Sequence, residues 1–206
     1  MTIFKYHTIG SGRTLNTMSC MIERAIQNAK FHGINLFPGT KNPARGDCIF
    51  ESVIDNINMR HCFTEKLSED PSYWRSVWLT EIERIGFDYW NLDRTKEEWK
   101  AEFNLMKQPG VYEMPLFDLI PPGIAHCVRK NLLVFNTSPQ AHCPIYVVPA
   151  TAFGSNANSE VPICLAYNQS HYESLIPCSD QDIQKTVLLS KQVSEVKQIL
   201  TLILIR

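Results

Sequence analysis

Apolar residues recur every three or four positions through the first half of the chain, which is the spacing of amphipathic helices. This spacing predicts helices over Leu15–Phe31 and Cys48–Asn58, a helix beginning at Pro71, and a short helix over Thr95–Met106. Two start signals support the later helices, because Asp70 precedes a proline and Thr95 opens a Thr-Lys-Glu-Glu capping sequence. Since Pro121-Pro122-Gly123 interrupts an apolar run, the next helix is expected to begin after it.

The second half of the chain carries short apolar runs bounded by turn residues, which predict strands. These strands are expected over Leu132–Asn136, Ile145–Val148 and Ile163–Tyr167. Because helices come first and strands second, the order favours an α+β fold over a doubly wound sheet.

The segment from residue 179 onward returns to helical spacing and becomes almost wholly apolar over 199–205. Three interpretations stay open for this tail. The first is a final helix packed on the domain. The second is a connection to further chain in a longer protein. The third is a helix that pairs with a partner or lies on a membrane surface.

Composition narrows the class of protein. With 206 residues, 44% hydrophobic residues, 20% charged residues and a net charge of -1, the chain fits one globular domain with no expected nucleic-acid partner. The apolar run Leu200–Ile205 is far shorter than the roughly 20 residues of a membrane span, and no secretory signal opens the chain. Seven cysteines without a CxxC pair predict neither a disulfide framework nor a metal site. A reducing, cytoplasmic location is therefore expected, including a host cytosol if a pathogen or mobile element encodes the chain.

Two segments that are far apart in the sequence carry the candidate catalytic residues. Cys48 opens a predicted helix after the polar loop 42–47, and His171 follows the apolar run 161–167, so that we expect it at the end of a strand. A helix N-terminus stabilises a thiolate, and a nearby imidazole accepts the thiol proton. A separation of about 120 residues is typical of cysteine proteases, whose catalytic groups meet only in the folded chain.

These two segments resemble motifs of the ovarian-tumour (OTU) family of cysteine proteases, which are deubiquitinases. The family's Asp-Gly-Asn-Cys-Leu/Phe motif is similar to residues 45–50, which read Arg-Gly-Asp-Cys-Ile-Phe. Its His-Tyr-Asn/Asp-Ser motif is similar to residues 171–174, which read His-Tyr-Glu-Ser. Between them, residues 110–116 and 124–135 loosely match the family's central stretch, so the resemblance covers about residues 38–177.

The resemblance implies an OTU-like (papain-like) α+β fold with a small central β-sheet packed between helices. On this interpretation, residues 1–37 form an N-terminal helical arm, 38–178 the OTU-like catalytic domain, and 179–206 a C-terminal helical extension.

The resemblance also implies residue roles: Cys48 as nucleophile, His171 as general base and then acid, and Glu173 as the group that orients the imidazole. The candidate oxyanion donors are the backbone N–H groups of Arg45, Gly46, Asp47 and Cys48.

Two of these positions depart from the family pattern, because Arg45 replaces its usual Asp and Glu173 replaces Asn or Asp. The extra methylene of a glutamate moves its carboxylate by about a bond length. Asn168 is an alternative orienting residue, and His126 is the rival base.

The implied substrate is ubiquitin or a polyubiquitin chain, cleaved at the isopeptide bond without a cofactor. Two alternatives stay open. One is a catalytically weak OTU-like module that binds ubiquitin, and the other is a thiol protease acting on a ubiquitin-like modifier or a polyprotein.

Overall fold

The computed structural model describes residues 11–40, 42, 46–60, 63, 66–68, 70–90, 95–112, 115–138, 143–153 and 159–204. Its helices are α1 (Ser11–Phe31), α2 (Cys48–Met59), α3 (Pro71–Trp90), α4 (Lys96–Met106), α5 (Ile120–Val128) and α6 (Asp180–Leu204). Short 3₁₀ helices, η1 (Pro115–Leu119) and η2 (Ala150–Phe153), precede α5 and β4. The strands are β1 (Leu36–Pro38), β2 (Lys130–Asn136), β3 (Ile145–Val148), β4 (Ser159–Tyr167) and β5 (Tyr172–Pro177).

The strands form one five-stranded mixed sheet in the order β1-β5-β4-β2-β3. Only β2 and β4 run parallel, while β4 and β5 form an antiparallel hairpin with Tyr167 paired to Tyr172. The first and last strands of the described residues, β1 and β5, are neighbours in the sheet.

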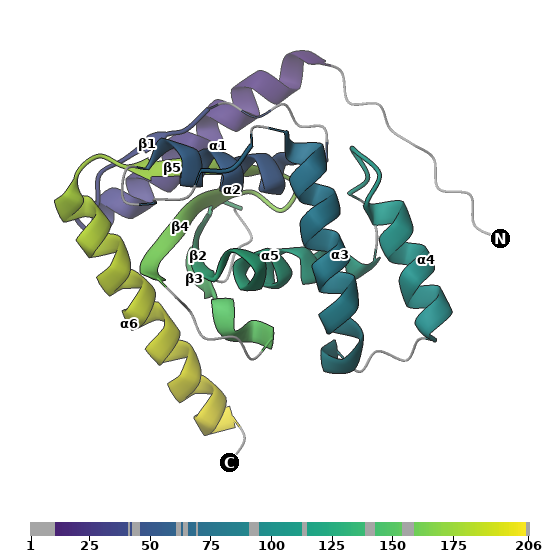
Figure 1. Ribbon diagram of the computed structural model, residues 1–206. Coiled ribbons are helices and arrows are strands. Elements are labelled where there is room, and N and C mark those ends of the chain that lie inside the picture. The colour runs from purple at the N-terminus through teal and green to yellow at the C-terminus, as the bar shows by residue number, and fades with distance from the viewer. Residues whose placement is uncertain are drawn as a thin grey trace.

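Helices cover both faces of this sheet (Figure 1), and the strand residues alternate between two apolar clusters. In β2, Leu132 and Val134 pack in the cluster with α2, α3, α4 and α5. Leu133 and Phe135 pack in the cluster with α1 and α6. This layering confirms the predicted α+β class, a central sheet packed between helices.

The predicted helix starts can be compared directly with the structure. The backbone N–H of Ser72 donates to Asp70 Oδ1 at 3.0 Å, and Thr95 forms a reciprocal capping box with Glu98, so both signals are confirmed. The expected start of the fifth helix after residue 123 is wrong, because α5 begins at Ile120. Its two prolines occupy the first turn, where a missing N–H costs no intrahelical bond.

The C-terminal segment forms α6, whose N-terminal half packs on the sheet beside α1. Ile183 and Val187 are buried, and Leu189 joins the cluster of α1. This packing agrees with the first of the three interpretations of the tail. The division of the chain at residues 37 and 178 stays a prediction. Among the described residues, no helix combines the length and hydrophobicity that crossing a bilayer requires.

A buried amide joins α2 to the β4–β5 hairpin. The Asn56 Nδ2 group donates to the carbonyls of Cys164 at 2.8 Å and Leu175 at 3.0 Å, and it lies 3.2 Å from Ser174 Oγ. Arg60 Nη1 donates to the side-chain amide oxygen of Asn56, Oδ1, at 3.2 Å. Because these groups are buried, the bonds replace water and fix the helix relative to both strands.

Candidate active site

Cys48 is the first residue of α2, and the backbone before it is tightly constrained. Gly46 has a φ of +84°, and a Cβ at this position would lie 2.3 Å from the Gly110 carbonyl oxygen. Only glycine therefore fits this turn. Asp47 directly precedes the helix but makes no side-chain capping bond to it. Its Oδ2 instead accepts the Gly110 N–H at 3.2 Å.

A fully buried arginine on α3, Arg75, forms hydrogen bonds to the turn at Gly46 and Asp47. Arg75 Nη1 donates to the Gly46 carbonyl at 3.0 Å and to Asp47 Oδ1 at 2.5 Å. Its Nε donates to the Met106 carbonyl at 2.7 Å, and its Nη2 donates to the Val111 carbonyl. One guanidinium thus connects the cysteine loop, the segment that directly precedes Cys48, to the loop that follows α4.

His171 lies in the turn of the β4–β5 hairpin, directly before β5, and not at the end of a strand as predicted. Asn168 builds this turn. Its Oδ1 accepts the backbone N–H groups of His171 at 2.9 Å and Ser170 at 3.2 Å, and Gln169 takes a φ of +79°. The Asn168 side chain therefore bonds to the backbone of the turn. The group that contacts the His171 imidazole is the Glu173 carboxylate.

Side chains from two segments that are distant in sequence meet at this point. His171 Nε2 lies 2.8 Å from Glu173 Oε1, and both side chains are almost fully buried. The Asn42 N–H donates to Glu173 Oε2 at 3.4 Å, which holds the second oxygen of the longer carboxylate. On the other side, the Tyr172 N–H donates to Cys48 Sγ at 3.4 Å, so the thiol contacts the residue between His171 and Glu173.

The imidazole is held in its charged form. Burial by itself lowers the pKa of His171, but interactions with Cys48 and Glu173 outweigh it and raise this pKa to about 9. The Nδ1 atom is buried and makes no hydrogen bond within the described part of the chain, although Cys48 is near enough to act on the ring. The arrangement therefore favours an imidazolium beside a thiol at neutral pH.

No protein-family model matches the sequence, and no curated protein is similar to it in sequence. Solved structures do match. The OTU domain of OTUD1 superposes with a TM-score of 0.52 at 11% identity, covering 79% of this chain and 98% of that domain. The chain has the OTU-domain fold. An OTU deubiquitinase from Wolbachia pipientis wMel matches at TM-score 0.48, 13% identity and coverage of 73% and 96%. The viral OTU domain protease from Taggert virus matches at TM-score 0.44, 14% identity and coverage of 71% and 83%. The resemblance stated from the motifs is thus confirmed at the level of the fold.

Within this OTU fold, the predicted site residues divide into two groups. Cys48, His171 and Glu173 come together, and Gly46 and Asp47 adjoin the thiol. Arg45 and the central match at 113–114 lie outside the described residues. The roles assigned to the residues of both groups stay predictions.

The rival histidine lies elsewhere in the OTU fold. His126 is part of α5, where burial lowers its pKa and Glu81 and Arg84 are its charged neighbours. Burial also raises the pKa of the adjacent Cys127 thiol to about 12, which leaves it a poor nucleophile. Within the described ranges, no three His, Cys, Asp or Glu side chains gather as a metal site would need.

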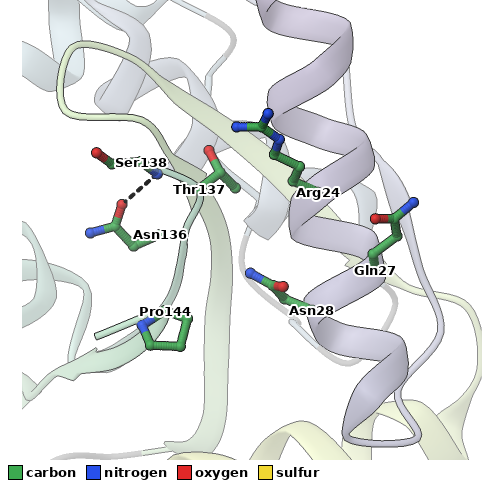
Figure 2. A pocket seen from close by; sticks show the side chains of 7 residues that line it. All are labelled: Arg24, Gln27, Asn28, Asn136, Thr137, Ser138 and Pro144. Atoms are coloured by element: carbon green, nitrogen blue, oxygen red, sulfur yellow. Dashed lines mark hydrogen bonds between the residues drawn. The ribbon is translucent and has the colours of Figure 1, made fainter. Parts of the chain in front are cut away.

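A separate polar hollow of about 260 Å³ lies between α1 and the end of β2 (Figure 2). Arg24 and Asn28 line it from the helix, and Thr137 and Ser138 line it from the strand side. Among the described residues, the side chains that line it include no thiol, imidazole or carboxylate, so its serine and threonine hydroxyls have no imidazole or carboxylate base beside them there.

The sequence analysis missed two residues of the candidate active site around Cys48, which are Arg75 and Asn42. Arg75 had a detectable signal, because Trp78, Leu79 and Ile82 follow it at helical spacing on the buried side of α3. An arginine in line with such a stripe must find partners in the interior. Asn42 lies in an irregular loop, where no periodicity shows that its side chain will be buried.

Proposed function

We propose that this chain is a cysteine-type deubiquitinase that hydrolyses isopeptide bonds at the C-terminus of ubiquitin. Cys48 is the nucleophile, His171 is the general base and acid, and Glu173 orients the imidazole. The observation that carries the proposal is the His171–Glu173 contact of 2.8 Å beside a thiol at a helix N-terminus, within an OTU fold.

In the first half of the reaction, the Cys48 thiolate attacks the carbonyl carbon of the terminal glycine of ubiquitin. The negative charge that develops on the carbonyl oxygen is stabilised by backbone N–H groups of the cysteine loop, and the first N–H groups of a helix have no intrahelical partner. The protonated His171 then gives its proton to the leaving lysine amine as the C–N bond breaks, which leaves a thioester on Cys48.

In the second half, a water molecule attacks the thioester carbonyl while neutral His171 accepts one of its protons. The C–S bond breaks, ubiquitin leaves with a free carboxylate, and the thiolate–imidazolium pair is restored. Glu173 keeps one ring nitrogen engaged throughout, so the other is free to exchange protons with sulfur, amine and water.

A ubiquitin whose C-terminus carries a thiol-reactive electrophile tests the proposal. We expect covalent capture of the wild-type chain at Cys48, seen as a mass increase of one ubiquitin, and cleavage of polyubiquitin by the unlabelled enzyme. Binding to ubiquitin without capture would show a binding module instead. Capture by a probe built on a ubiquitin-like modifier, but not by ubiquitin itself, would move the proposal to that substrate.

The pH dependence tests the role of Glu173. Because the pKa of His171 is raised to about 9, the wild-type rate should fall as the pH rises through about 9 and the imidazolium loses its proton. Glu173→Ala removes one interaction that favours the imidazolium, so this alkaline fall should move to lower pH. The same variant should lower kcat by about 10²-fold with little change in KM, since it misplaces a group that acts in the transition state.

Glu173→Asp and Glu173→Asn are the controls, because each keeps a shorter acceptor. Both should recover part of the lost rate. If all three variants match wild-type kcat and the alkaline limb does not move, Glu173 is a structural carboxylate and has no orienting role.

A further inference from the structure

The residue next to the proposed nucleophile carries a negative charge that should oppose its chemistry. Asp47 is buried and directly precedes Cys48. An unpaired carboxylate beside a thiol disfavours the thiolate, because two like charges would share a poorly hydrated site. This carboxylate therefore needs compensation if Cys48 is to ionise near neutral pH.

Arg75 supplies that compensation from an interior position. Its side chain is 0% exposed, and its Nη1 contacts Asp47 Oδ1 at 2.5 Å. The guanidinium also lies over the ring of Phe50, a residue in the first turn of α2, at 5.1 Å from the ring centre. A buried cation of this kind is costly unless it is paired and fully hydrogen-bonded, and four acceptors satisfy it here.

Arg75 also fixes the direction of one peptide group. The Gly46 carbonyl and the Asp47 N–H belong to the same planar trans peptide, so they point in opposite directions. Since Arg75 Nη1 holds the Gly46 carbonyl at 3.0 Å, the Asp47 N–H is turned away from α3. A glycine at a φ of +84° could otherwise let this peptide rotate.

We propose that Arg75 is a positioning residue of the active site. It neutralises Asp47 so that this carboxylate does not oppose the Cys48 thiolate, and it orients the Asp47 N–H as an oxyanion donor. The second role rests on the proposed hydrolase function, whereas the first concerns the thiol alone and can be measured without substrate.

The groups that act on the Cys48 thiol come from several elements, and each must stay in place during the test. His171, Tyr167 and Tyr172 interact electrostatically with Cys48. Four further charged groups lie one contact or a few residues away: Glu173 contacts His171, Asp47 and Glu51 flank Cys48 at the start of α2, and Arg75 contacts Asp47.

The experiment measures alkylation of Cys48 by iodoacetamide against pH, read by mass spectrometry on the Cys48 peptide, with the exposed Cys20 as an internal reference thiol. Arg75→Met should raise the pH midpoint of Cys48 alkylation by about one unit and leave that of Cys20 unchanged. It should also lower kcat/KM for ubiquitin cleavage by about 10²-fold. Arg84 is an exposed arginine on the same helix, so Arg84→Met should change neither the alkylation midpoint of Cys48 nor kcat/KM.

The double variant Arg75→Met with Asp47→Asn separates the two roles. Without either charge, the alkylation midpoint should return close to the wild-type value. Because the Gly46 carbonyl has still lost its donor, kcat/KM should stay low. A midpoint that stays raised would overturn the charge role, and a kcat/KM restored to wild type would overturn the orienting role.

Asp47→Asn alone keeps the proposal testable if Arg75→Met does not fold. This variant retains the hydrogen bonds of Arg75 to backbone carbonyls but leaves its positive charge uncompensated, so the alkylation midpoint should fall below the wild-type value. An unchanged midpoint in folded protein would contradict the proposal. If the wild type does not cleave ubiquitin at all, the proposed function fails, while the alkylation midpoints still decide the charge role.

Discussion

Replacing Cys48 by alanine should abolish ubiquitin cleavage, with kcat reduced by at least about 10⁴-fold, because the proposed thioester forms on its sulfur. The fold should survive, since the change removes one sulfur atom at a helix terminus and the α2 contacts of Phe50 and Val53 are kept. Cleavage of polyubiquitin followed by gel electrophoresis, with circular dichroism on the same sample, measures both effects.

Cys164→Ala is the matched control. This cysteine is fully buried in β4, so its removal leaves a small cavity and should lower the thermal midpoint while turnover at low temperature is kept. Retained turnover in folded Cys48→Ala protein would end the proposed mechanism.

The second large effect is expected at the base. His171→Ala should lower kcat by about 10⁴-fold, because the thiol loses its proton acceptor and the amine loses its proton donor. The variant should also react more slowly with iodoacetamide at pH 7, since the cation that favours the thiolate is gone.

His126→Ala provides the comparison, because this imidazole belongs to α5 and its charged neighbours are Glu81, Arg129 and Arg84. Its kcat should stay within a few-fold of wild type. If His126→Ala were the inactive variant and His171→Ala the active one, the catalytic assignment would be wrong.

Local signals in the sequence were enough to predict the long helices and the proposed pair. Amphipathic spacing gave α1 and α2, and capping chemistry marked the starts of α3 and α4. Cys48 and His171 could be proposed because their immediate neighbours resemble family motifs. Such signals act over a few residues and need no knowledge of the tertiary contacts.

What the sequence could not show depends on partners distant in the chain. β1 has three residues and ends at a proline, and β5 buries Glu173 and Ser174, so neither has the apolar pattern of a strand. Glu173 can be buried because His171 and the Asn42 N–H bond to its carboxylate. Arg75 can be buried because Asp47 and three backbone carbonyls accept its hydrogen bonds. These polar groups are satisfied only by tertiary structure, which periodicity does not reveal.

The adjacency of β1 and β5 has a consequence for the chain as it is synthesised. Leu36 pairs with Pro177, and Cys48 meets a backbone N–H that lies 124 residues further along. Ribosomes release the N-terminal part first, so the helix bearing the thiol emerges well before the hairpin that bears the imidazole. On the proposed mechanism, an incomplete polypeptide therefore holds a cysteine without its imidazole partner, and the proposed catalytic pair forms only once β5 is inserted beside β1. On the proposed mechanism, late closure of this kind delays the reactivity of the thiol until most of the chain has been synthesised.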